Sequence, residues 1–235
     1  MVPERTGVQE RAGGKHLGGR RTRQGGKRLT DARATVQPRS IAARGRAVHT
    51  ARVAADRQGK HAWNTVAVAR RGETGRAVEA LSAVGRFWPT RYRQVIAGYV
   101  EPPPAARRIA AEYERHCEWP QLLERLLPLE RSAPFERADV TETLCLELEN
   151  EYQRLCGRTF YVRARLRGLE GRLEGRAVER AVGGFLVERT QAAGAPAQVR
   201  FDDPDLVLMI EVIEQRVGFG LLDREVRRLP LVRPR

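Results

Sequence analysis

The sequence predicts an α+β fold built from two small units that follow a basic N-terminal tail. Segments with the two-residue alternation of a half-buried strand take turns with segments in which apolar residues recur at helical spacing, which indicates mixed layers of strands and helices. The charge is unevenly divided. Residues 1–61 carry 15 Lys and Arg against 4 Asp and Glu, whereas residues 62–235 carry 28 against 25. A basic tail in front of a nearly balanced folded part is therefore predicted.

The tail, residues 1–61, is rich in Gly, Arg and Gln and poor in large apolar side chains. It cannot bury enough apolar surface to offset the entropy of ordering the chain, so it is predicted to be disordered. A basic disordered arm would add non-specific affinity for phosphate. The alternative is that the tail is translated upstream sequence and that the true start is a valine codon such as Val48 or Val53.

The first unit is predicted over residues 62–137. Its order of strand, helix, strand, helix and strand is compatible with a small ferredoxin-like unit. A proline inside the last segment predicts an edge strand, because proline cannot donate to a sheet ladder. The expected elements are a strand at 63–69, a helix from a Thr74 cap to a stop at Gly85, a strand at 94–100, a helix opened by the prolines 102–104 and ending near Cys117, an amphipathic turn at 121–127 and the edge strand at 127–131.

The second unit is predicted over residues 138–235, and its first helix has the clearest signal. Asp139 and Glu142 resemble a capping box, and apolar residues from Val140 to Leu155 recur at helical spacing until Gly157. The later elements are expected as a strand at 159–167, a loop at 168–175, a helix to about Ala192, an alternating stretch at 197–201, a strand at 206–213 and a strand at 217–222. The nearly continuous apolar run at 206–213 is typical of a central strand buried on both faces.

The strand at 159–167 alternates strictly, with Phe160 and Val162 on one face and arginines on the other. Arginines at two-residue intervals are spaced about 6.6 Å apart, which approximates the spacing of adjacent phosphates on an RNA strand. The alternative is a solvated face held by ion pairs with nearby glutamates. We expect a phosphate-tracking surface formed by seven arginines: Arg163, Arg165, Arg167, Arg172, Arg176, Arg180 and Arg200.

Four segments of the second unit occur in an order and at a spacing that resemble a known domain. They are the helix end Leu155–Gly157 with the strand start Thr159–Arg163, the helical Val182–Phe185, the Asp202–Asp205 turn that leads into Leu206–Val212, and Val217–Glu225. Together these segments span most of residues 138–235. They resemble the THUMP domain, an RNA-binding module of tRNA-modifying systems, and the resemblance implies that this unit binds tRNA.

THUMP domains usually accompany a catalytic domain, and the chain ends about ten residues after its last predicted strand. The first unit resembles the N-terminal part of the stand-alone THUMP adaptors, which help an acetyltransferase make N4-acetylcytidine in tRNA. The resemblance thus implies a non-catalytic adaptor that presents tRNA to a separate RNA-modifying enzyme, such as that acetyltransferase. Because the sequence shows neither a membrane-length apolar run nor the apolar stretch of a secretory signal, a cytoplasmic protein is expected. The alternatives are an RNA-modifying enzyme subunit, a degenerate fragment of a THUMP-containing tRNA methyltransferase or thiouridine synthetase, and a ribosome-associated protein.

Motifs for other chemistry are missing from the sequence. It has no Gly-Lys-Ser/Thr loop, no GxGxxG after a strand, no GxSxG and no HExxH, so we expect neither a cofactor nor a metal. Three cysteines without a CxxC pair are expected to be buried small hydrophobes. No apolar run approaches the roughly 18 residues of a membrane span.

Glu211 and the aspartates at 202, 203 and 205 have competing interpretations. Glu211 interrupts the most apolar strand and is expected to be structural, either paired with an arginine or placed at the strand end, although a general acid is the alternative. The aspartates at 202, 203 and 205 are expected to form a turn rather than a metal site.

Tryptophans at 63, 88 and 119 are expected to anchor the core of the first unit, with base stacking as the alternative.

Overall fold

A computed structural model of the chain describes residues 62–101, 105–136, 140–169 and 171–234. These residues belong to one compact unit, Pro38–Arg235, and form two β-sheets. The expectations for the tail, for the prolines 102–104 and for a cap at Asp139 lie outside the described residues. None of the helices in the described part combines the length and the apolar character that crossing a membrane requires.

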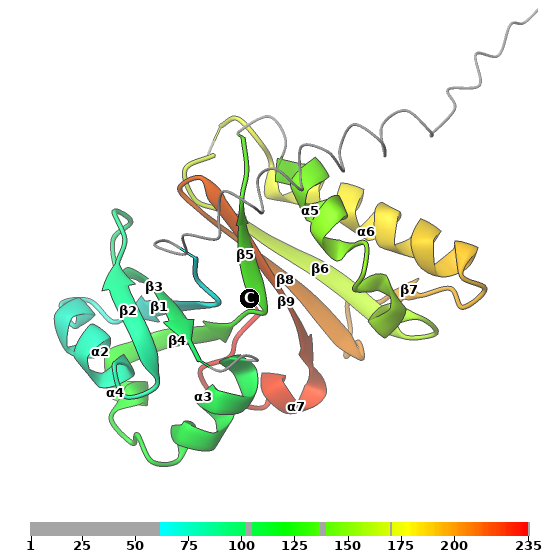
Figure 1. Cartoon of the computed structure of the whole chain (residues 1–235). Helices are drawn as coiled ribbons and strands as arrows, with labels where there is room; N and C mark the ends of the chain where they lie inside the picture. Colours follow the sequence, from blue (N-terminus) through cyan, green and yellow to red (C-terminus); the bar gives the residue numbers. More distant parts are fainter. Residues whose placement is uncertain (1–61, 102–104, 137–139, 170, 235) are drawn as a thin grey trace, which may run out of the picture. The chain divides into compact units, whose positions relative to one another are not determined.

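The first sheet has the connectivity of a ferredoxin-like unit (Figure 1). Its strands lie in the order β2-β3-β1-β4, and each neighbouring pair is antiparallel. One helical connection joins β1 to β2 and another joins β3 to β4, so the predicted ferredoxin-like unit is confirmed, although its sheet has four strands where the sequence predicted three. The elements are β1 (Thr65–Ala69), α2 (Thr74–Leu81), β2 (Gly85–Pro89), β3 (Val95–Val100), α3 (Ala105–Tyr113), α4 (Trp119–Leu122) and β4 (Leu123–Pro128).

The boundaries of several elements in this unit differ from the prediction. Residues 121–127 were expected to form a turn, but most of them form β4, because a short leucine-rich run suits either state and pairing with β1 selects the strand. Gly85 begins β2 instead of ending α2, which stops at Leu81. Sequence reasoning missed β2 because Gly85 and Pro89 at its ends imitate turn signals. Thr74 is the first helical residue, with Glu73 at the N-cap position.

The second sheet has the strand order β5-β9-β8-β6-β7. Its central strand β8 is parallel to β6 and antiparallel to β9, and every β8 residue is buried, which confirms the predicted central strand. In Figure 1, α5 and α6 lie side by side over this sheet. The elements are β5 (Arg131–Pro134), α5 (Val140–Leu148), the 3-10 helix η2 (Tyr152–Leu155), β6 (Thr159–Leu166), α6 (Gly175–Ala192), β7 (Gln198–Val199), β8 (Leu206–Ile213), β9 (Arg216–Asp223) and α7 (Arg224–Arg227).

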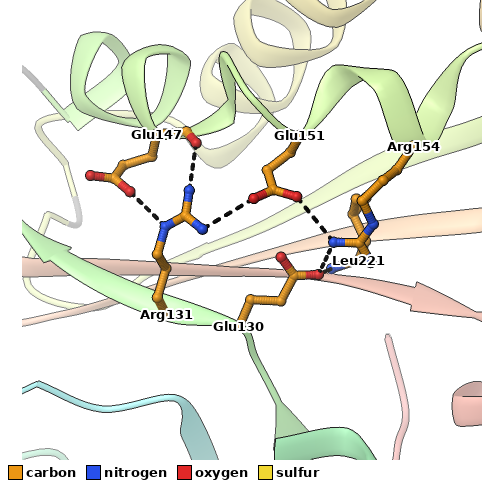
Figure 2. A network of polar contacts seen from close by, with 6 residues as sticks. All are labelled: Glu130, Arg131, Glu147, Glu151, Arg154 and Leu221. Atoms are coloured by element: carbon orange, nitrogen blue, oxygen red, sulfur yellow. Dashed lines mark hydrogen bonds and ion pairs between the residues drawn. The ribbon is translucent and has the colours of Figure 1, made fainter. Parts of the chain in front are cut away.

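The long helix expected up to Gly157 is wrong, because α5 ends at Leu148 and a short 3-10 helix follows. At the break, the backbone N–H of Glu151 donates to the Leu148 carbonyl, three residues back. The Glu147 carbonyl instead accepts from Arg131 Nη2 at 2.8 Å, and Arg131 Nε donates to the Glu147 carboxylate at 2.8 Å (Figure 2). A side chain from β5 therefore replaces the missing helical hydrogen bond.

The network in Figure 2 extends this link between the helical layer and the sheet. Arg131 Nη1 donates to Glu151 Oε1 at 3.1 Å, and Arg154 Nη1 donates to Glu151 Oε2 at 3.1 Å and to Glu130 Oε1 at 2.5 Å. Arg131 and Arg154 thus hold the α5–η2 segment to residues 130 and 131. Their guanidinium groups are engaged by carboxylates and serve the fold.

Apolar residues of the two sheets share one core cluster. It includes Trp63 and Leu127 from the first part and Val207 and Met209 from β8. Because β5 pairs with β9, the second sheet takes a strand from residues that precede 138. The proposed division into domains at 137/138 stays a prediction, and the strand pairing favours a start of the second domain at or before Arg131.

Two glycines of β9 allow this close packing. A Cβ atom on Gly218 would lie 2.3 Å from the Trp63 ring, and one on Gly220 would lie 2.8 Å from Leu129 Cα. Any larger residue would force the surrounding chain apart. The Val217–Leu222 segment, which carried part of the THUMP resemblance, therefore needs glycine at both positions for a physical reason.

Candidate nucleic-acid interface

The structure distributes the predicted arginine surface over several places. Strand β7 pairs only with Thr159 and Phe160, so the outer edge of β6 beyond Phe160 has no strand partner among the described residues. Around this edge Arg163 approaches α6, with Nη1 3.9 Å from Glu179 Oε1. Arg165 instead lines a cleft beside β1 and β4, and Arg167 pairs with buried Glu211. Arg163, Arg165 and Arg167 therefore do not form a single row.

A groove of about 680 Å³ lies along α6 and reaches β6 and β7; we call it the α6 groove. Three of the predicted arginines, Arg163, Arg176 and Arg180, line it. Gly183 and Gly184 also line it, and a Cβ on exposed Gly184 would meet nothing within 4 Å, so the helix leaves open space there. The groove combines apolar walls with guanidinium groups.

Phe201 is the most unusual residue of the α6 groove. Its side chain is 80% exposed, and nearby Val199 is 50% exposed. Both residues belong to the alternating stretch predicted over residues 197–201, of which only Gln198 and Val199 form a strand. Strand β7 ends after two residues, at Val199, and a turn with Asp203 at φ +40° follows, so there is no sheet to cover them. A large exposed apolar side chain beside arginines is a functional signal.

The charges around the α6 groove are only partly neutralised. Glu179 Oε1 accepts from the Ala164 backbone N–H at 2.9 Å and lies only at the outer limit of ion pairing from Arg163. Four more of the predicted arginines are exposed and have no ion pair with any residue that the structure describes. These are Arg172, Arg176, Arg180 and Arg200. Their guanidinium groups are available to an anionic partner.

The second concave feature is a cleft of about 440 Å³ that we call the arginine cleft. Arg70, Arg125, Arg165 and Arg233 line it, and they come from the end of β1, from β4, from β6 and from the C-terminal segment. The pKa of Arg165 is lowered mainly by burial, and the nearby positive charge of Arg125 is the second cause. Sequence reasoning found only Arg165, because no local spacing connects four positions so distant in the chain.

Glu211 is fully buried between two arginines. Its Oε1 accepts from Arg125 Nη2 at 2.8 Å, and its Oε2 pairs with Arg167. The structural role predicted for Glu211 is thereby confirmed. Burial lowers the pKa of Arg125, and the charge of Glu211 opposes that effect. Arg167, predicted to contact phosphate, is instead committed to this pair.

The Asp202–Asp205 segment forms a structural turn. Asp205 Oδ2 accepts from the Thr159 backbone N–H at 2.9 Å and from its hydroxyl at 2.8 Å, and these bonds tie the start of β8 to the start of β6. Both hydrogen bonds hold the pKa of Asp205 below its usual value, and the bond from the Thr159 backbone N–H has the larger effect. Within the described ranges, no group of three His, Cys, Asp or Glu could hold a metal ion.

The cysteines are less buried than expected. Cys117 is exposed, and Cys145 and Cys156 are intermediate, so the prediction of buried small hydrophobes is wrong. Trp63 and Trp119 are buried in the core, as predicted. Trp88 is only partly buried and packs at the margin of the shared cluster.

Comparison with known proteins identifies similar folds. No protein-family model matches the chain, and no curated protein matches it in sequence. TrmN from Thermus thermophilus is similar with a TM-score of 0.50 and 21% identity, over 72% of this chain and 48% of that protein. PH1313 from Pyrococcus horikoshii Ot3 has a TM-score of 0.47 and 14% identity, over 67% and 53%.

A third structure, a 4-thiouridine synthetase in complex with RNA and bound ATP, has a TM-score of 0.43 and 11% identity, over 67% of this chain and 40% of that protein. The chain thus spans about half the length of the solved structures that it matches, or less. The likeness to TrmN shows a shared fold.

Proposed function

We propose that this chain binds RNA and acts in tRNA modification, with the α6 groove as its main RNA contact. The observation that carries the proposal is the exposed Phe201 ring in a groove lined by Arg163, Arg176 and Arg180. Unpaired bases stack on exposed aromatic rings, and guanidinium groups neutralise the adjacent phosphates. The THUMP resemblance of the sequence and the fold shared with TrmN support the same proposal.

The finer proposal is that the chain is a non-catalytic adaptor that presents tRNA to a separate modifying enzyme, such as an N4-acetylcytidine acetyltransferase. The absence of nucleotide-binding and nucleophile motifs from the sequence supports this assignment. A second candidate is an RNA-binding part of a larger enzyme, because the chain covers only 48% of TrmN. In both cases the chemistry would come from residues outside this chain.

Binding of the full chain to tRNA, followed by fluorescence anisotropy over a range of salt concentrations, tests RNA recognition. Phe201→Ala is expected to weaken binding roughly 5- to 150-fold, because one stacked base contributes about 1–3 kcal/mol. The double change Arg176→Gln and Arg180→Gln is expected to reduce the slope of log affinity against log salt by about 1.4–1.8. Arg107→Gln is the matched control, since Arg107 is an exposed arginine on α3, outside the groove.

All these positions are exposed, so the variants should keep the parent's circular dichroism spectrum and melting temperature. If folded Phe201→Ala and the double arginine variant bind tRNA as tightly as the parent, the α6 groove is not the RNA contact. A separate incubation of the purified chain and tRNA with acetyl-CoA, ATP or S-adenosylmethionine tests the adaptor assignment. Modification without a second protein would contradict it.

A further inference from the structure

The arginine cleft brings together four positive charges that carboxylates of the described residues neutralise only in part. Four guanidinium groups from four separate segments line it, whereas Glu124 is the one carboxylate among its lining residues. Arg165 has no ion pair or hydrogen bond with any described side chain. Such a concentration of like charge is unfavourable by itself, because neighbouring cations repel one another at low dielectric. An anion in the cleft would remove that repulsion.

Arg125 supplies a second and independent sign of a ligand. Its side chain is 94% buried, and only Nη2 is used, in the bond to Glu211. The Nε and Nη1 donors of Arg125 are buried and have no hydrogen-bond partner among the residues that the structure describes. Buried donors in native proteins are nearly always paired, so two unpaired ones on a single side chain call for a partner other than the described residues. Arg125 lines the cleft, where such a partner has room.

The chemistry of the donors selects the kind of anion. A guanidinium group offers two parallel N–H donors that match two oxygens of a phosphate or carboxylate. Charge then distinguishes the two. The four lining cations face Glu124, and Glu211, which pairs with Arg125, is also paired with Arg167, so the excess of positive charge leaves room for more than a single negative charge. A phosphomonoester carries about 1.5 to 2 negative charges at pH 7, more than a carboxylate or a phosphodiester.

We propose that the arginine cleft binds one phosphate group, that Arg125 and Arg165 are its principal donors with Arg70 and Arg233 at the rim, and that a terminal phosphomonoester is preferred over a phosphodiester. The site shares no lining residue with the α6 groove. Binding of phosphate does not depend on the proposed function. Only the assignment of the phosphate to an RNA end rests on it.

The first experiment uses inorganic phosphate and the full chain. Phosphate is expected to raise the melting temperature relative to chloride at the same ionic strength, because a ligand that binds only the folded state stabilises it. Arg165→Gln is expected to lose this increment while keeping its fold, since Arg165 makes no ion pair with a described residue. Arg125→Lys, which retains a charge beside Glu211, is expected to reduce it, and Arg107→Gln to retain it.

The second experiment compares one RNA hairpin carrying a 5′-phosphate with the same hairpin carrying a 5′-hydroxyl. The parent is expected to bind the phosphorylated hairpin roughly tenfold more tightly, and Arg165→Gln to lose that preference. Phe201→Ala is expected to weaken both hairpins equally, since Phe201 lies in the other groove.

The outcomes are distinguishable. If phosphate stabilises Arg165→Gln as much as the parent, the cleft is not a phosphate site. If inorganic phosphate binds through Arg165 but the two hairpins bind alike, the site stands and a small phosphorylated molecule, not an RNA end, is its ligand. If neither hairpin binds at all, the proposed function fails, and the result with inorganic phosphate decides the cleft alone.

Discussion

Replacing Glu211 by glutamine tests the buried charge pair at the centre of the second sheet. The side chain of Glu211 is 0% exposed, and those of Arg125 and Arg167 are 6% and 16% exposed. Glutamine has nearly the same shape and can keep one hydrogen bond, but it removes the negative charge. Two guanidinium groups would then remain in a poorly hydrated site without the carboxylate that compensates them.

Breaking a buried ion pair by removing one partner costs about 3–5 kcal/mol. Arg167 is the more exposed of the two arginines and can partly move into solvent, which favours the lower end of this range. For a folded part of this size, each kcal/mol corresponds to a shift of about 2–4 °C. Glu211→Gln is therefore expected to lower the melting temperature by roughly 6–20 °C.

Urea unfolding, monitored by circular dichroism, measures this loss of unfolding free energy. The comparison between variant and parent is valid if the slope of unfolding free energy against urea concentration is the same for both. Glu124→Gln serves as the control, because Glu124 is an exposed neighbour on β4 and its loss is expected to cost less than about 0.5 kcal/mol. A loss below about 1 kcal/mol for Glu211→Gln would refute the reasoning, since it would mean that water reaches the pair in solution.

Three further predictions concern other parts of the fold. Asp205→Asn should cost roughly 1 kcal/mol at pH 7. Because the pKa of this carboxyl is lowered on folding, its contribution is present above the normal value of 3.8 and is lost as the pH falls through the folded pKa, so acid unfolding curves of variant and parent should converge. Burial raises the pKa of Cys145 to about 11, so at pH 8 a thiol reagent should modify exposed Cys117 first, and mass spectrometry of early time points that found Cys145 labelled equally fast would contradict this. Gly220→Ala should destabilise the fold by about 1–3 kcal/mol because backbone lies 2.8 Å from the added Cβ, whereas Gly184→Ala, in an open helical position, should stabilise it by about 0.5–1 kcal/mol; thermal unfolding that showed no difference between the two would count against the packing argument.

The arginines of the folded part serve two different purposes. Arg131 and Arg154 hold the α5–η2 segment through the network of Figure 2, and Arg167 compensates Glu211. Arg163 and Arg165 keep most or all of their donors free of carboxylates in the described part of the chain. A count of arginines therefore overstates the surface available to RNA, and the ion pairs of the fold show which ones remain.

The sequence by itself determined the α+β class, the ferredoxin-like character of the first unit without its strand β2, and the central position of β8. These features follow from local periodicity, because a run that is apolar on both faces must be buried on both faces. The pairing of Glu211 with arginine was equally accessible, since a carboxylate in such a run requires a compensating cation.

Only the tertiary structure decided where the arginines of β6 act and which other residues join them. A two-residue period assigns each side chain to a face but does not say whether a neighbouring strand covers the edge, and β7 ends too early to do so. That early end leaves Phe201 exposed. Arg163 lines the α6 groove, whereas Arg165 lines a cleft with residues of the first sheet. The arginine cleft depends on contacts between segments more than a hundred residues apart, such as Arg70 and Arg233, and no local pattern records which distant segments will meet.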